Sequence, residues 1–115
     1  NITMLDFVGH REIDGYFRVS KVFLNTSTEE GFPNTFIQAC KNMTPIVSLS
    51  VNPDSFIDDF GVGEFCGGDE GKLMESIKNI LNNETILLKY ADAAFNYVKE
   101  YHCIKRNAKV LERLI

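Results

Sequence analysis

The order of apolar and polar segments in this 115-residue chain predicts an α/β protein, a Rossmann-like parallel sheet flanked by helices. Short apolar runs of strand type alternate with segments in which apolar residues recur every three or four positions. A strand-like run, a polar turn and a helix follow one another within residues 22–42, and further runs of strand type come after them. This alternation is typical of βαβ units, whose parallel strands are joined by helices.

The pattern predicts four strands and six helices. The strands are expected at 2–8, 22–25, 45–50 and 64–66. The helices are expected at 12–20, 35–42, 55–60, 69–81, 85–101 and 104–115. A complete doubly wound sheet usually has more strands, and the chain begins without methionine. We therefore expect a piece of a longer protein that lacks its first βα units.

Local composition supports the individual elements. Residues 2–8 are apolar at most positions, as in a strand buried on both faces, and residues 45–50 are rich in β-branched side chains. Ile13 and Phe17 share one face of the first predicted helix. Asn52, followed by proline, provides a turn and capping signal ahead of the short helix at 55–60.

Composition also limits the possible partners and the setting. A net charge of −4 and an isoelectric point near 5.1 argue against a nucleic-acid partner, which would need a basic surface. No apolar run approaches the ~20 residues of a membrane span. Cys40, Cys66 and Cys103 show neither disulfide nor metal-ligand spacing, so we expect a cytoplasmic protein without a bound metal, its thiols packed as small apolar groups.

Residues 25–40 combine the features of an anion site with a nearby acid. A strand leads through Glu29, Glu30 and Gly31 into the start of a helix. The first amides of a helix have no internal partners, and the helix dipole places about half a positive charge there. A carboxylate just ahead of the helix can accept hydrogen bonds from hydroxyl groups. Phosphate together with hydroxyls indicates a sugar phosphate or a nucleotide sugar.

Five stretches make the signal specific. They are LDFV, KVFLNTS, EGFPNTFIQAC, TPIVSLSVNPD and FCGGDEGKL. In these stretches the chain resembles the C-terminal, donor-binding half of the group 1 glycosyltransferases, retaining enzymes of the GT-B fold. The resemblance extends over nearly all of residues 1–115, which would form one partial nucleotide-sugar-binding domain.

The resemblance implies a role for each residue of the central turn. Glu30 is the first acid of the family's paired-glutamate motif and would hold hydroxyls of the donor sugar, which makes it the predicted catalytic residue. The predicted donor-binding residues are Gly31, Phe32 and Pro33 along the sugar, Asn34 and Thr35 at the diphosphate, Gln38 at the ribose, and His10 in the loop that meets the base.

For the full-length protein, the resemblance implies transfer of a hexose with retention in glycan, polysaccharide or glycolipid biosynthesis. The donor would be a UDP-, GDP- or ADP-sugar, with no metal or other cofactor. A sugar, lipid or protein acceptor would bind through a preceding N-terminal domain, which would also make any membrane contact. The basic groups for the diphosphate would come from earlier segments as well. We therefore expect residues 1–115 to be inactive by themselves, and the whole protein to be cytoplasmic or peripheral at a membrane.

Gln38, Met43 and Asp6 depart from the family pattern, and Asp6, which replaces a glycine near the base loop, has no explanation in the sequence. Gln38 stands where the family has its second glutamate, and a neutral acceptor there should weaken donor binding by about 1 kcal/mol. Met43 stands where the family has a glycine that ends the helix in a left-handed turn. We expect Asn42 to take that conformation instead.

Other interpretations remain open at this stage. Glu30 can be a solvated loop acid and Gln38 an ordinary surface residue. Asp54, Asp58 and Asp59 fit helix capping and a solvated face better than a metal site. The whole domain can also be a degenerate, non-catalytic nucleotide-sugar-binding domain, or part of a sugar-nucleotide epimerase of the same fold.

Overall fold

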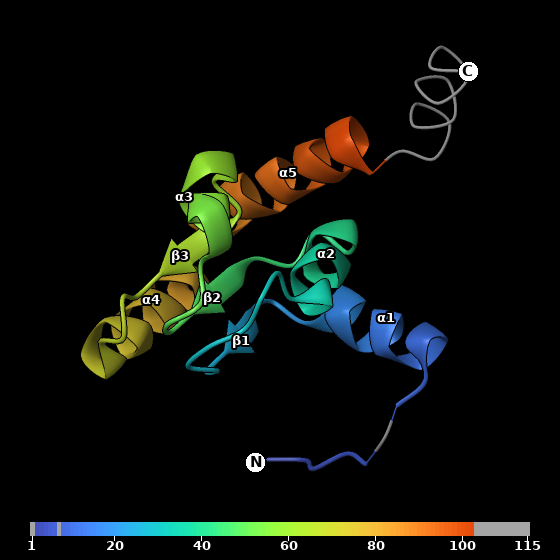
Figure 1. The fold of residues 1–115 in the computed structure, drawn as a ribbon, viewed down its shortest axis with the longest axis horizontal. Coiled ribbons are helices and arrows are strands. Elements are labelled where there is room, and N and C mark those ends of the chain that lie inside the picture. The colour runs from blue at the N-terminus through green and yellow to red at the C-terminus, as the bar shows by residue number, and fades with distance from the viewer. Residues whose placement is uncertain (1, 7, 103–115) are drawn as a thin grey trace.

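The computed structural model describes residues 2–6 and 8–102, which form a three-stranded parallel sheet with helices around it (Figure 1). The strands are β1 (Phe23–Asn25), β2 (Ile46–Ser48) and β3 (Gly63–Phe65), with β2 in the centre. The helices are α1 (His10–Val19), α2 (Asn34–Lys41), α3 (Phe56–Phe60), α4 (Glu70–Asn82) and α5 (Glu84–Tyr101), and a 3₁₀ turn, η1 (Pro53–Ser55), precedes α3. This arrangement confirms the predicted α/β class.

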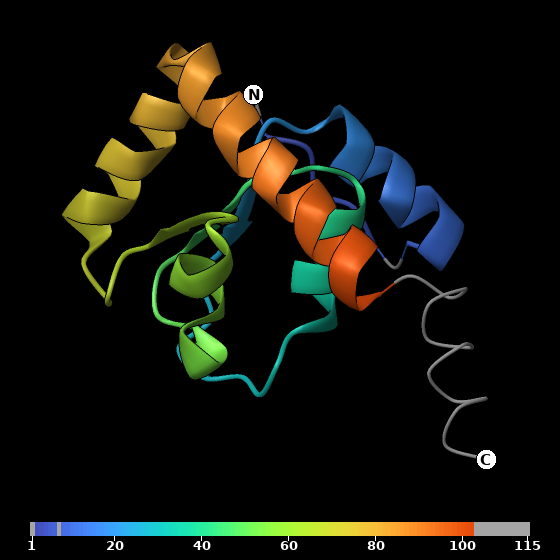
Figure 2. The ribbon, with the colours of Figure 1, turned by 90° about the horizontal axis from the view of Figure 1, so that it is seen from above.

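Helices cover both faces of the sheet, as predicted. Ile46 packs in a cluster with Phe36 of α2 and Ile57 of α3, whereas Val47 packs in a cluster with Ile80 of α4. Adjacent residues of β2 belong to different clusters because successive side chains of a strand point to opposite faces. The long helix α5 contacts both α4 and α2, and Figure 2 shows it running from one to the other.

The strand predicted at 2–8 is wrong for the residues that the structure describes. Residues 2–6 form neither strand nor helix, and the side chains of Ile2 and Met4 are each 88% exposed. A strand needs a neighbour to pair its backbone groups, and β1 is paired only with β2. The apolar run indicated a segment suited to burial, but the described part of the chain contains no strand partner for it.

Helix boundaries agree with the expected ones to within two residues over the described range. The residues at the N-caps of η1 and α3, Asn52 and Ser55, make no side-chain capping bond of the usual kind, but Asn52 does bind the first turn of α3. Asn52 Oδ1 accepts a hydrogen bond from the Ile57 amide at 2.8 Å, ahead of α3. Asp69 Oδ1 accepts from the Lys72 amide at 3.1 Å and caps α4. The helix predicted at 104–115 lies outside the described residues.

The two described cysteines, Cys40 and Cys66, are free and buried in the core. Burial raises the pKa of the Cys40 thiol to about 12, so the group is protonated at neutral pH. The expectation that these cysteines pack as small apolar groups is confirmed, while Cys103 lies outside the described residues.

The end of α2 corrects a second expectation. Met43, not Asn42, adopts the left-handed conformation, with φ of 56° against −101° for Asn42. The Thr44 amide donates to the Ala39 carbonyl at 2.8 Å and the Met43 amide to the Cys40 carbonyl at 3.1 Å, which is a Schellman motif. This pairing assigns the left-handed position to residue 43, and the Asn42 side chain instead donates to the Gln38 carbonyl at 2.9 Å.

We predict that Met43→Gly raises the free energy of unfolding by about 0.5–1 kcal/mol. Left-handed backbone costs a non-glycine residue roughly 1–2 kcal/mol, and the greater freedom of glycine in the unfolded chain offsets part of the gain. Urea denaturation of the purified protein measures the change. Met43→Ala keeps the Cβ atom and should give no comparable gain. A loss of stability in the glycine variant would contradict the described end of α2.

Candidate functional site

The candidate site lies where β1 and β2 end, at the carboxyl edge of the parallel sheet. Ligands of open α/β sheets bind at this edge. A cavity of about 570 Å³ separates the loop after β1 from the loop after β2. It is lined by Thr28, Glu29, Glu30 and Gly31 from the first loop and by Ser50, Val51, Asn52 and Pro53 from the second. We call this cavity the candidate cleft.

Glu30 occupies the first wall of the candidate cleft, with an exposed carboxylate. Its Oε2 atom accepts a hydrogen bond from Asn25 Nδ2 at 3.0 Å. The bond involves one of the two carboxylate oxygens and ties the Glu30 side chain to the end of β1. A carboxylate has about four lone-pair sites, so it can accept further hydrogen bonds from a bound ligand.

Asn25 is a residue that the sequence interpretation missed. Only 6% of it is exposed, and its Oδ1 atom accepts from the Ser27 amide at 2.8 Å. One side chain therefore both starts the turn and contacts the acid within it. The available signal was an asparagine at the end of a run that is otherwise apolar, five residues before Glu30.

The second wall is fixed by Ser48, to which sequence analysis assigned no role either. Ser48 is fully buried, and its hydroxyl donates to the Val51 carbonyl at 2.6 Å and accepts from the Val51 amide at 3.2 Å. Asn52 Nδ2 donates to Asp58 Oδ2 at 2.9 Å. These bonds hold the loop after β2 in a defined shape opposite Glu30.

The rest of the predicted turn is anchored by packing. Gly31 lines the cleft beside Glu30, while Pro33 is buried at the start of α2. The Phe32 ring is half exposed and meets the Phe56 ring edge-on, with 4.9 Å between ring centroids. Phe32, one of the predicted sugar-lining residues, thus packs against the aromatic core at the start of α3.

The start of α2 leaves backbone donors available. No hydrogen bond joins the amide of Asn34 or Thr35 to an acceptor among residues 2–6 and 8–102, and no side chain there caps the helix. Unpaired amides at a helix start can bind an anion. Binding of a diphosphate by these amides stays a prediction.

Of the predicted site residues whose side chains the structure describes, Glu30 and Gly31 line the candidate cleft, and five do not: Phe32, Pro33, Asn34, Thr35 and Gln38. Thr35 lines a separate cavity of about 260 Å³ beside α1 and β1. Gln38 is half buried on α2. His10 is the first residue of α1, and its side chain lies outside what the structure describes. A ligand that contacts all of these groups would have to extend beyond the cleft.

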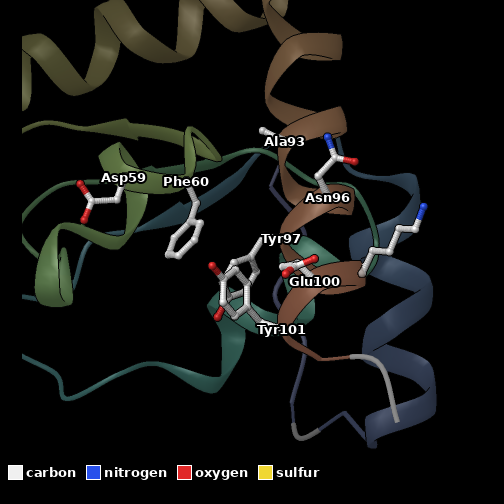
Figure 3. A pocket seen from close by; sticks show the side chains of 8 residues that line it. Asp59, Phe60, Ala93, Asn96, Tyr97, Glu100 and Tyr101 are labelled. Carbon is white, nitrogen blue, oxygen red and sulfur yellow. The ribbon is translucent and has the colours of Figure 1, made fainter. Parts of the chain in front are cut away.

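A larger cavity, of about 790 Å³, lies between α3 and α5 (Figure 3). The rings of Phe60, Tyr97 and Tyr101 face one another there, with centroid separations of 4.6–5.3 Å. Burial is the largest cause of the raised pKa of Tyr97, and the charges of Cys40 and Tyr101 raise it further. This cavity is away from the strand ends, and it contains none of the residues that the sequence singled out as donor-binding.

Within the described part of the chain, no group of three or more His, Cys, Asp or Glu side chains is arranged to hold a metal ion. None of the described helices combines the length and the apolar character needed to cross a membrane.

The fold and the cleft define the class of protein: an α/β domain with a cavity at the ends of its parallel strands. A family model, "Glycosyl transferases group 1", matches residues 1–83. The chain belongs to this family of group 1 glycosyl transferases, which confirms the resemblance drawn from its motifs.

Two curated relatives are similar to the chain. One is the UDP-N-acetylglucosamine–peptide N-acetylglucosaminyltransferase GtfA subunit of Streptococcus parasanguinis, 26% identical over 98 residues, which are 84% of this chain and 18% of the relative. The other is alpha-monoglucosyldiacylglycerol synthase of Acholeplasma laidlawii, 32% identical over 87 residues, 75% of this chain and 22% of the relative. The chain thus spans about a fifth of these relatives. No solved structure matches it significantly.

Proposed function

We propose that residues 1–115 form part of the donor-binding domain of a retaining glycosyltransferase that transfers a hexose from a nucleoside diphosphate sugar. One observation carries the proposal: the family's EGFPN segment places Glu30 in a cavity at the strand ends, with its carboxylate oriented by Asn25. Membership of the family supports the reaction class. Proposed as a partial C-terminal domain of a GT-B fold, this part would be inactive without the remainder of the protein.

In the proposed mechanism, Glu30 accepts hydrogen bonds from hydroxyls of the donor sugar and so fixes the anomeric carbon. The backbone of Gly31, Phe32 and Pro33 borders the sugar. The free amides at the start of α2 stabilise the negative charge that develops on the departing diphosphate. Exposed helix termini supply only about 0.3–1 kcal/mol per charge, so basic groups from elsewhere in the protein complete this task. The acceptor oxygen bonds to the anomeric carbon on the face that the diphosphate leaves, the bond to the diphosphate breaks, and the hydroxyl proton passes to the departing phosphate oxygen.

The nucleoside would extend from the cleft along α2. Gln38 would accept from a ribose hydroxyl, and the loop before α1, with His10, would meet the base. The role of Gln38 is compatible with its place outside the cleft lining, since a nucleotide sugar is longer than its sugar alone. The proposed donor is a UDP-, GDP- or ADP-sugar, without a metal or other cofactor.

The names of the two curated relatives differ: one names a peptide, and the other names the synthesis of a monoglucosyldiacylglycerol. We propose that the acceptor of this protein is chosen by another domain, and that the protein is cytoplasmic or peripheral at a membrane. A second candidate is a nucleotide-sugar-binding domain without transfer activity, which the replacement of the family's second glutamate by Gln38 favours. Donor binding without turnover would identify it.

We predict that Glu30→Ala lowers kcat/KM of the full-length protein for its nucleotide sugar by at least 100-fold. The variant loses the carboxylate that the donor hydroxyls require, and each charged hydrogen bond contributes about 1.5–3 kcal/mol. The loss of two such bonds, about 3–6 kcal/mol, corresponds to more than 100-fold in rate. Steady-state transfer or donor-hydrolysis assays measure the change. Glu75→Ala, which removes an exposed carboxylate from α4, is the matched control and should behave as wild type. Near-full activity in Glu30→Ala would refute the site assignment.

For Gln38→Glu we expect unchanged or several-fold tighter donor binding in isothermal titration calorimetry. A charged acceptor binds a ribose hydroxyl more strongly than a neutral amide, by about 1 kcal/mol. Gln38→Ala is the comparison variant and should bind the donor more weakly than wild type. Markedly weaker binding by Gln38→Glu would mean that residue 38 does not face the ribose.

A further inference from the structure

We infer that Asn25 is a positioning residue, whose amide group holds Glu30 in the orientation needed for the donor sugar. The inference rests on the proposed function of Glu30 and adds a residue with no contact of its own to the donor. The Asn25 side chain makes two hydrogen bonds, one as an acceptor and one as a donor. Its Oδ1 atom accepts from the Ser27 amide at 2.8 Å, and its Nδ2 atom donates to Glu30 Oε2 at 3.0 Å.

The Ser27 amide determines which way the Asn25 side chain faces. A backbone N–H can only donate, so the atom facing it must be the oxygen of the asparagine amide. The NH₂ group is then directed at the Glu30 carboxylate, which when ionised can only accept. The side chain therefore has one satisfied orientation, and that orientation presents a donor to Glu30.

Asn25 is itself held in place by burial and by the pairing of β1 with β2. Asn25 is only 6% exposed and ends β1 opposite Ser48, and its carbonyl accepts from the Leu49 amide at 2.9 Å. The Ser48 side chain also binds the backbone of the loop that follows it, at Val51. Two paired strand-end residues thus shape the two walls of the candidate cleft, and only Asn25 reaches the acid.

A simpler role for Asn25 would be the start of the turn alone. An aspartate performs that role equally well, because its carboxylate also accepts from the amide two residues ahead. Aspartate differs in presenting an acceptor, not a donor, to Glu30. Asn25→Asp therefore preserves the size and the bond to Ser27, while it replaces the proposed positioning bond by repulsion between two carboxylates and adds a charge at a buried position.

The test compares Asn25→Asp, Glu30→Gln and the double variant in the full-length protein. UDP-N-acetylglucosamine and UDP-, GDP- and ADP-glucose serve as probes, with kcat/KM and thermal melting as readouts. Asn25→Asp is expected to lower kcat/KM at least tenfold at pH 8. Asn79→Asp, the same change on an exposed position of α4, is the control and should leave activity unchanged.

The pH profile separates positioning from a purely structural effect. Two adjacent carboxylates at positions 25 and 30 repel each other when both are ionised, and they share one proton as the pH falls. The defect of Asn25→Asp should therefore be smaller at pH 5.5 than at pH 8, relative to wild type. Glu29 is the other titratable residue in the described lining, and Asp58 faces the cleft loop through Asn52; both are the same in every variant.

The double variant tests the contact without any donor. In Asn25→Asp with Glu30→Gln, the aspartate accepts from the glutamine amide, so the hydrogen bond returns with reversed polarity. Its melting temperature should recover towards the wild-type value, although activity stays as low as in Glu30→Gln. This rescue is expected even if Asn25→Asp alone fails to fold.

The outcomes distinguish the two proposals. Full activity in Glu30→Gln would overturn the proposed function, and the role of Asn25 with it. Low activity in Glu30→Gln with full activity in Asn25→Asp would overturn the positioning role alone. A double variant that remains as destabilised as Asn25→Asp would also overturn it, since the lost stability would then come from burial or from the turn.

Discussion

The parallel pairing of β1 with β2 is the constraint on which the candidate cleft depends. It aligns Asn25 with Ser48, so the two strands end at the same level and their following loops face each other. Each loop is then shaped by the polar side chain at its strand end. Because both strands are only three residues long, the helices that pack on β2 from either side, α2 and α4, are needed to keep this register.

The turn after β1 is held at both ends by different kinds of interaction. At its start, the buried amide of Asn25 binds Ser27 and Glu30. At its end, Pro33 is buried and Phe32 packs on Phe56. The exposed carboxylate therefore lies on a segment with little freedom, which reduces the entropy cost of binding a ligand there. This is the physical argument for treating Glu30 as more than a solvated loop acid.

Much of this arrangement could be predicted from the sequence, because it depends on local patterns. Apolar patterning located the longer helices, and the turn signal at Asn52 located the short helix α3. Features that depend on distant partners could not be predicted. The apolar run at 2–8 did not reveal that its described residues lack a strand partner, and Met43 takes a position that a glycine usually occupies. The bond between Asn25 and Glu30 depends on the exact shape of a turn, which composition does not determine.

The central claim is that the cleft between the two loops receives the sugar of a nucleotide sugar. A crystal structure of the full-length protein with its bound donor tests it most directly. The account predicts sugar hydroxyls within hydrogen-bond distance of the Glu30 carboxylate and the diphosphate at the amides of Asn34 and Thr35. A donor bound in the aromatic cavity between α3 and α5, or a sugar directed away from Glu30, would contradict it.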